Sequence, residues 1–323
     1  MARKLTEDRD NLLADVAEMY FVEGMNQSEI SKQIGVTRSM VSRMLTEARS
    51  KEIVKIQIDR RFEFDHKIQA EITRRFALED AVIFTGYVED SFRYLSRLGS
   101  VAANVIQPYI KPGITLGTAW GTALDATINA LEVQKTRDIK VIQLVGALRG
   151  RNLDIDGHGV VQHLVTKTGG VGYFLNVPYI VDKPETIKSL MQVPGVSSTM
   201  QLMKECDVGL FGVGSADLDY STFYSGGYLI AEEMRGLIQF GAVGNVAGLF
   251  FNLDGKPTGR EFQARSFTIS RRDLMEIPVR FGIAGGMGKV KAILGALRGK
   301  YINILITDAY TAKGILEMDA EET

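Results

Sequence analysis

The chain has 323 residues, 45% of them hydrophobic, enough to bury the cores of about two domains without disulfide support. Its 38 basic and 39 acidic residues nearly cancel, so affinity for a polyanion must come from local clusters of charge. The single cysteine, Cys206, excludes an internal disulfide, while the charged N-terminus and the lack of a long apolar run argue against secretion and membrane insertion, so we expect a cytoplasmic protein.

The first fifty residues predict three helices. Apolar side chains recur at helical spacing over residues 9–22. Asn26 and Glu29 then have the spacing of a capping box, and Gly35 is a natural end for the short helix that they begin. Thr37 is a good N-cap for the third helix that follows. Small residues stand where the second and third helices must approach each other closely and at the tight turn between them. They indicate a helix-turn-helix rather than a generic helical hairpin.

The third predicted helix has an apolar and a polar side. Its inward residues are Val41, Met44, Leu45 and Ala48. Its outward side chains are short hydroxyls and guanidiniums, which reach base edges and phosphates in a major groove, and residues 31–61 hold eight basic against three acidic residues. The residues expected to contact DNA are Gln27, Thr37, Arg38, Ser39, Ser42, Arg43 and Arg49. The alternative is a small helical domain that uses this face for protein contact.

Two segments connect this region to the rest of the chain. The alternating pattern of residues 52–59 predicts a strand that braces the helical unit or starts a wing. Residues 60–80 predict a charged connecting helix, with Phe64, Ile68 and Ile72 on a side that packs on a partner or on the second domain. We therefore expect an all-α DNA-binding domain over 1–60 and an α/β domain for effector binding and oligomerisation over 61–323.

From residue 81 onward, short apolar runs alternate with segments of helical pattern. The runs that predict strands are 81–85, 114–117, 140–146, 171–176, 207–214, 278–286 and 302–308. The segments that predict helices lie near 94–110, 121–132, 157–167, 227–239, 288–298 and 309–317. This alternation predicts a mostly parallel sheet covered on both faces, which binds ligands at the carboxyl ends of its strands.

The stretch LGTAWGT, residues 116–122, lies at that edge, on a predicted strand-to-helix turn. Glycines let the backbone approach a ligand, threonines add hydroxyls, and a helix N-terminus offers N–H groups to an anion. Glycine-containing turns at 145–151, 211–215 and 283–289 bring Arg149, Arg151 and Lys289 to the same rim. Converging glycine turns with a few cations favour a phosphorylated small molecule, although a turn that binds nothing is the plain alternative.

Other candidate residues favour structural roles. His158 and His163 are five residues apart, which does not suit a metal pair on one helical face, and no acidic or cysteine cluster accompanies them. Cys206 precedes a strand, as a small buried hydrophobe often does. Trp120 either packs in the core or stacks on a sugar ring, and Asp125 is placed to interact with a helix dipole. We therefore expect no metal and no cofactor.

Three stretches of the chain resemble one family. They are AEMYFVEGMNQSEISKQIGVTRSMVSRMLTEARSKEIVKIQI near the N-terminus, GAVGNVAGLFFNLDGKP, and VRFGIAGGMGKVKAILGALRGKYINILITDAYTA near the C-terminus. The chain is similar there to the SorC/DeoR-type sugar-binding transcriptional regulators of bacteria. The resemblance implies an N-terminal DNA-reading module and a C-terminal domain related in fold to sugar-phosphate isomerases and deaminases. It also implies homodimers or homotetramers whose grip on operator DNA changes when a phosphorylated sugar binds.

The resemblance also implies a set of pocket residues. Carried onto this sequence, they are Gly117, Thr118, Trp120, Gly121, Thr122, Asn245 and Lys289, to which the rim adds Arg149. The family pattern has Asp at the positions of Asn245 and Asn252, so the effector of this chain is expected to be more anionic or more oxidised. We expect the protein to regulate transcription of a carbohydrate operon, and to act on it as a repressor. The alternative is a sugar-phosphate isomerase or deaminase with an added N-terminal domain; the sequence places no acid or base clearly at these turns.

Overall fold

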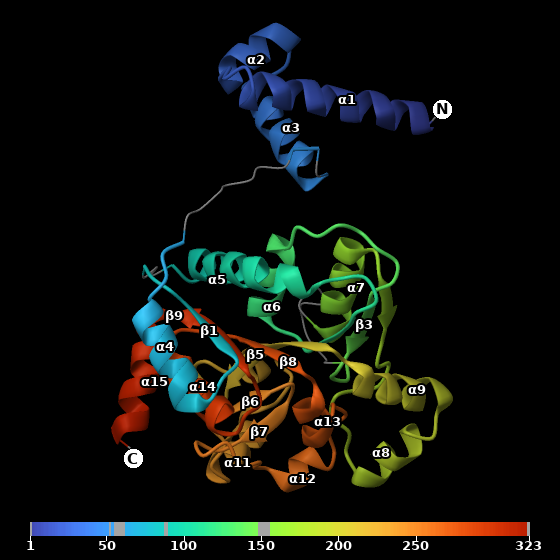
Figure 1. Ribbon diagram of the computed structural model, residues 1–323. Helices are drawn as coiled ribbons and strands as arrows, with labels where there is room; N and C mark the ends of the chain where they lie inside the picture. The colour runs from blue at the N-terminus through green and yellow to red at the C-terminus, as the bar shows by residue number, and fades with distance from the viewer. Residues whose placement is uncertain (1, 52, 55–61, 87–89, 148–155, 322–323) are drawn as a thin grey trace. The chain divides into compact units, whose positions relative to one another are not determined.

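The computed structural model describes residues 2–51, 53–54, 62–86, 90–147 and 156–321, with side chains from residue 9 onward (Figure 1). The chain divides into two compact units, Met1–Arg61 and Phe62–Thr323. No helix in these ranges is long and apolar enough to cross a lipid bilayer.

The first unit consists of three helices around a small core. They are α1 (Ala2–Phe21), α2 (Gln27–Ile34) and α3 (Arg38–Ser50), so α1 begins earlier than the apolar spacing indicates. The predicted inner face of α3 is confirmed, since its four inward residues pack against Leu13 and Val16 of α1 and Ile30 of α2. This arrangement is the expected helix-turn-helix, with α1 as the supporting helix.

The ends of these helices are capped by the residues that the sequence indicates. Asn26 Oδ1 accepts hydrogen bonds from the backbone N–H groups of Ser28 and Glu29, at 3.0 and 3.1 Å. The Glu29 carboxylate accepts one from the backbone N–H of Asn26 at 2.8 Å, which completes the capping box. Gly35 ends α2 with a φ of 69°, where a side chain would be strained. Local chemistry therefore fixes the turn between α2 and α3.

The second unit is built on a sheet whose seven main strands run parallel. Their order is β1-β9-β8-β5-β2-β3-β4. The bounds are β1 Asp80–Phe84, β2 Thr115–Thr118, β3 Lys140–Gln143, β4 Val171–Tyr173, β5 Val208–Ser215, β8 Val279–Ile283 and β9 Ile304–Asp308. A short antiparallel hairpin, β6 (Gly244–Val246) and β7 (Leu249–Phe251), pairs with the end of β5.

Helices cover both faces of the sheet, as the alternation in the sequence predicts (Figure 1). One face carries α5 (Ser91–Ile106), α6 (Thr122–Ala130) and α7 (Gly157–Thr168); the other carries α4 (His66–Phe76), α14 (Val290–Arg298) and α15 (Ala309–Glu321). The remaining helices are η1 (Gln107–Tyr109), α8 (Pro184–Leu190), α9 (Pro194–Leu202), η3 (Met203–Glu205), α10 (Thr222–Ser225), α11 (Ala231–Gln239), α12 (Arg260–Gln263), α13 (Arg271–Glu276) and η4 (Met287–Lys289). The fold is thus a three-layer α/β domain.

One feature of the second unit was not predicted, one open alternative is decided, and one prediction lies largely outside the described residues. The hairpin β6–β7 was not predicted, because its strands are shorter than a period-two pattern needs. Helix α4 buries Ile68 and Ile72 in the core of the second unit, so of the two alternatives for this apolar side the structure shows packing on the second domain. The strand expected over residues 52–59 falls largely outside the described residues.

Candidate functional site

The outward surface of α3 is polar and basic. Arg38, Ser39, Ser42 and Arg43 are all exposed there, and we call these four residues the α3 face. None of the four belongs to an ion pair between described residues. The α3 face therefore presents two guanidiniums and two hydroxyls to solvent, the groups that bind phosphates and base edges.

The other residues predicted to contact DNA lie around this face with further contacts of their own. The Thr37 hydroxyl caps α3, accepting from the Met40 N–H at 3.3 Å, and Gln27 is partly buried at the start of α2. The Arg49 guanidinium lies over the Phe21 ring, 5.3 Å from its centroid. Thr37 and Arg49 therefore hold α3 in place, whatever they contact in DNA.

Ion pairs fix the C-terminal half of α3 against α1. Arg9 and Glu47 form a two-point pair with N–O distances of 3.1 and 2.6 Å, and the Lys51 amine lies 2.7 Å from an Asp10 oxygen. Glu47 is the one acidic residue of α3, and its carboxylate is paired with Arg9 of α1; the second carboxylate, Asp10, belongs to α1 itself. No unpaired carboxylate of α3 therefore lies beside the α3 face.

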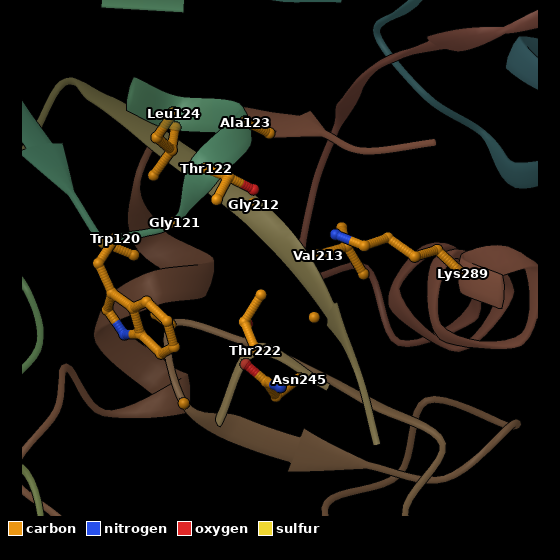
Figure 2. A pocket seen from close by; sticks show the side chains of 14 residues that line it. Trp120, Gly121, Thr122, Ala123, Leu124, Gly212, Val213, Thr222, Asn245 and Lys289 are labelled. Atoms are coloured by element: carbon orange, nitrogen blue, oxygen red, sulfur yellow. The ribbon is translucent and has the colours of Figure 1, made fainter. Parts of the chain in front are cut away.

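A pocket lies in the second unit at the carboxyl ends of β2, β5 and β8 (Figure 2). The strand β2 continues into α6 on one face of the sheet, and β8 continues into α14 on the other, so the pocket sits where the connections diverge. The described residues that line it are Ala119, Trp120, Gly121, Thr122, Ala123, Leu124, Gly212, Val213, Gly214, Thr222, Asn245, Ala247, Gly248 and Lys289.

One wall of the pocket is the N-terminus of α6. Gly121 precedes the helix with a φ of 130° and caps it with no side chain. The first bond within the helix is the one from the Asp125 N–H to the Gly121 carbonyl, so the N–H groups of the three preceding residues have no partner within the helix. This wall therefore offers N–H donors and the positive end of a helix dipole to an anion.

Lys289 supplies the charge of the pocket. Its side chain extends from η4 toward the middle of the cavity (Figure 2), and it makes no ion pair with a described residue. Burial lowers the pKa of its amine from the ordinary 10.5 to about 8, and no carboxylate of the described residues offsets that effect. Because none of the described lining residues is Asp, Glu or His, an anionic ligand would be the counter-charge of Lys289.

The opposite side of the pocket is polar and neutral. Figure 2 shows Thr222 and Asn245 close together there. Asn245 is buried in β6, and its side chain makes no hydrogen bond within the described part of the chain. An amide and a hydroxyl in this position suit the hydroxyl, carbonyl or carboxyl oxygens of a polar ligand.

The hairpin that carries Asn245 turns through Ala247 and Gly248, which have φ values of 51° and 72°. Positive φ at both residues suits a two-residue turn, although it is unusual for alanine. Buried hydroxyls hold the turn: Thr268 donates to the Ala247 carbonyl at 2.6 Å, and Tyr179 to the Gly248 carbonyl at 2.9 Å. The strained turn is thereby fixed at the pocket wall.

Trp120 packs in the core and also borders the pocket. Its ring packs edge-on against Phe223 and Tyr228, with centroid distances of 4.9 and 5.0 Å, and also lines the pocket. The free space in the pocket is about 30 Å³, little more than ordered water needs. A sugar-sized ligand would therefore extend beyond this space or widen it.

The structure brings together five of the eight residues predicted for the effector site: Trp120, Gly121, Thr122, Asn245 and Lys289. Gly117 and Thr118 lie in β2 and do not line the pocket. A Cβ on Gly117 would come within 2.8 Å of Cys206 Sγ, so this glycine allows close packing, and the buried Thr118 hydroxyl donates to the Ala119 carbonyl. Arg149 lies outside the described residues.

Several lining residues were not predicted. Thr222 begins a four-residue helix after a loop and belongs to no motif, so only the fold brings it to the pocket. Ala247 and Gly248 follow Asn245 closely, but an Ala-Gly turn is a weak hairpin signal. Asn252 instead accepts the Lys256 N–H at 2.8 Å in a local turn away from the pocket.

The remaining candidates have structural surroundings. Burial raises the pKa of the Cys206 thiol to about 12, which makes it a poor nucleophile. His158 stacks on Phe174, and His163 lies 3.7 Å from an Asp125 oxygen. The described residues contain no cluster of His, Cys, Asp or Glu that could hold a metal ion.

Comparison with protein families gives two matches. Residues 60–317 match the family model Sugar-bind, described as "Putative sugar-binding domain". Residues 14–51, which include α2 and α3, match the model of sigma-70 region 4. The first match covers the pocket and the second covers the α3 face.

Individual proteins are similar over nearly the whole chain. The transcriptional regulator LsrR of Escherichia coli K12 is 29% identical over 94% of this chain and 94% of its own. The deoxyribonucleoside regulator of Bacillus subtilis 168 is 24% identical over 97% of this chain and 99% of its own. The crystal structure of the full-length sorbitol operon regulator SorC from Klebsiella pneumoniae has a TM-score of 0.72 at 24% identity, covering 96% of this chain and 99% of that one, so the fold is shared.

Proposed function

Because the chain belongs to the sugar-binding-domain family, we propose that it is a DNA-binding transcriptional regulator whose grip on an operator is set by a phosphorylated sugar. The α3 face would bind the operator, and the pocket would bind the effector. Relatives matched over nearly their full length, one named as a transcriptional regulator and one as a deoxyribonucleoside regulator, support the pairing of these two activities in one chain. We expect such a protein to act in the cytoplasm, as a repressor that the effector releases.

The DNA-binding proposal rests on the chemistry of the α3 face. A recognition helix enters the major groove with its N-terminal residues at base edges, and Arg38, Ser39, Ser42 and Arg43 occupy the first turns of α3. A single unit of this size reads only a short site. We therefore propose a homodimer or homotetramer that binds repeated half-sites, which light scattering with and without operator DNA tests directly.

Lys289 is the single observation that carries the effector proposal. A partly buried cation with no acidic partner among the described residues, in a pocket formed partly by an open helix N-terminus, is unfavourable until an anion binds. A phosphate dianion would accept hydrogen bonds from the N–H groups of α6 and at the same time neutralise the charge of Lys289. The unphosphorylated sugar lacks this interaction and should bind far more weakly.

A sugar-phosphate isomerase or deaminase remains the alternative function. Such chemistry needs a positioned acid or base, and the described lining residues offer only the Lys289 amine as a titratable group. Incubating the protein with the ligands that bind it, and following product formation, separates a sensor from an enzyme.

A thermal-shift screen tests the proposed function. Matched pairs of phosphorylated and unphosphorylated sugars are added to the full-length protein, because a ligand that binds only the folded state raises Tm by mass action. We expect at least one phosphorylated member to raise Tm and its unphosphorylated partner to leave it unchanged. Equal shifts for both members of every responding pair would contradict a phosphate-reading pocket.

A further inference from the structure

A hydrogen-bonded cluster lies directly behind the turn that carries Lys289. This turn joins β8 to η4 through Gly285 and Gly286, and the Lys289 N–H donates to the Gly286 carbonyl at 2.9 Å. The cluster consists of Tyr94 from α5, Asp308 at the end of β9, and Thr311 in the first turn of α15. None of the three lines the pocket.

The cluster holds the turn through a continuous chain of hydrogen bonds. The Gly286 N–H donates to Thr311 Oγ1 at 2.7 Å, and this hydroxyl donates to Asp308 Oδ2 at 2.5 Å. The Tyr94 hydroxyl donates to the same carboxylate oxygen at 2.6 Å. Asp308 Oδ1 accepts the Thr311 N–H at 2.8 Å, so the carboxylate also caps α15. Gly286 is thereby fixed on its N–H side by the cluster and on its carbonyl side by Lys289.

Close packing at Gly285 adds a geometric constraint. A Cβ at this position would meet the Tyr94 hydroxyl at 1.9 Å, Asp308 Oδ2 at 2.7 Å and Thr307 Oγ1 at 3.1 Å. The backbone of the turn therefore lies directly on these oxygens. Asp308 and Thr311 are themselves buried, so water competes little for their bonds.

We propose that Tyr94, Asp308 and Thr311 are positioning residues of the effector site. By fixing Gly286, they hold the backbone of η4 so that the Lys289 amine points at the pocket before the ligand arrives. Preorganisation of this kind lowers the loss of conformational freedom on binding. This inference rests on the proposed function, because it concerns the anion that Lys289 would bind.

Hydroxyl-deleting variants of the full-length protein test the role of the cluster. Tyr94→Phe and Thr311→Val each remove one hydroxyl from the chain of hydrogen bonds and preserve the shape of the side chain. Thr311→Ser keeps the hydroxyl, and Tyr109→Phe is a matched control, since its ring packs edge-on against Phe281 away from the cluster. The probe is inorganic phosphate, with affinity measured by calorimetry and Tm recorded for every variant.

We expect Tyr94→Phe and Thr311→Val to weaken phosphate binding about tenfold, the cost typical of ordering one long side chain when the ligand arrives, because the Lys289 amine is no longer held in place beforehand. Thr311→Ser and Tyr109→Phe should retain the affinity of the natural protein. Rescue by serine separates positioning from general packing, because serine restores the bond while it leaves out the methyl group. Binding is measured well below the lowest Tm, so that every variant is folded.

Two results would overturn the inference in distinguishable ways. Undiminished phosphate affinity in both hydroxyl-deleting variants would remove the positioning role and leave the proposed function intact. Failure of the natural protein to bind phosphate or any sugar phosphate would instead remove the proposed function itself. If Thr311→Val does not fold, Tyr94→Phe decides alone, because Tyr94 lies in α5, outside the turn and outside α15, and its hydroxyl donates to the Asp308 carboxylate.

Discussion

The α3 face and the pocket are both suited to phosphate groups, but they use opposite physical conditions. On the α3 face the guanidiniums of Arg38 and Arg43 are exposed to water, whereas the Lys289 amine is partly buried and its pKa is lowered by burial. Exposed cations bind a polyanion through many weak, salt-screened contacts, whereas a preorganised, desolvated cation selects one small anion. Under the proposed function, a chain with almost no net charge therefore holds two physically different anion sites.

Salt concentration should separate the two sites most strongly. Operator binding that involves six or more phosphate contacts should fall by about 10³-fold between 50 and 200 mM salt, because bound counterions are released. Effector binding at Lys289 should fall only a few-fold, since the pocket is shielded from solvent ions. Titrations of DNA and effector at matched salt concentrations measure both slopes; equal slopes would remove the distinction between the sites.

Removing the charge of the pocket should have the next largest effect. We expect Lys289→Ala to weaken effector binding by about 3 kcal/mol, roughly a hundredfold, because a charged hydrogen bond is lost in a partly buried site. The control is Lys291→Ala, which removes the same charge from an exposed position outside this pocket. Calorimetry with the effector from the thermal screen is the measurement, and similar losses in both variants would point to a general charge effect.

Removing one guanidinium from the α3 face tests the other site. Arg43→Ala should weaken operator binding by about 1–3 kcal/mol if this side chain reads a guanine, and should relax the preference at that base pair. Arg235→Ala is the control, since it removes an exposed arginine from the large unit. Selection from random duplexes followed by binding titrations measures affinity and preference; an unaltered base preference in Arg43→Ala would exclude a base contact.

The partly buried charge of Lys289 should also lower the free energy of unfolding, and this is the smallest of the expected effects. The pKa of Lys289 is about 8 in the folded chain against an ordinary 10.5, so the unfolded state binds more protons between these values and stability rises with pH across that window. At pH 7 the ligand-free variant Lys289→Met should be more stable than the natural protein by about 1–2 kcal/mol, a figure reduced for the partial solvent access of Lys289. Denaturant unfolding at pH 7 and 9.5 should show this gap shrinking; a constant gap would contradict a buried charge.

The features that the sequence predicted are those that depend on nearby residues. The capping box of Asn26 and Glu29 and the inner face of α3 need only spacing along one helix, and both are confirmed. The alternation of strands and helices also predicted the parallel sheet. The glycine turn before Lys289 and the turn at Gly121 were found for the same reason, since each is a local strand-to-helix junction.

The features that were missed depend on contacts between distant segments. Thr222 reaches the pocket only because the chain after β5 folds back over Trp120, and Tyr94 meets Asp308 only because α5 packs beside β9. Gly117 was predicted for the effector site but does not line the pocket, and its lack of a side chain allows the close packing of Cys206. A glycine near a turn thus predicts that some group packs closely against the backbone there, but whether that group is a ligand or another side chain depends on the fold.

The central claim is that effector binding at the pocket changes the affinity of the α3 face for operator DNA. Measuring operator affinity while the effector is added tests this coupling most directly. The operator is the duplex selected by the natural protein, and the effector is the phosphorylated sugar that raises its Tm. We predict that the effector weakens operator binding by the natural protein, while Lys289→Ala binds the same operator equally well and no longer responds to the same effector concentration. Operator affinity that the effector leaves unchanged in the natural protein, at saturation of the pocket, would contradict the account, since a ligand that shifts no population regulates nothing.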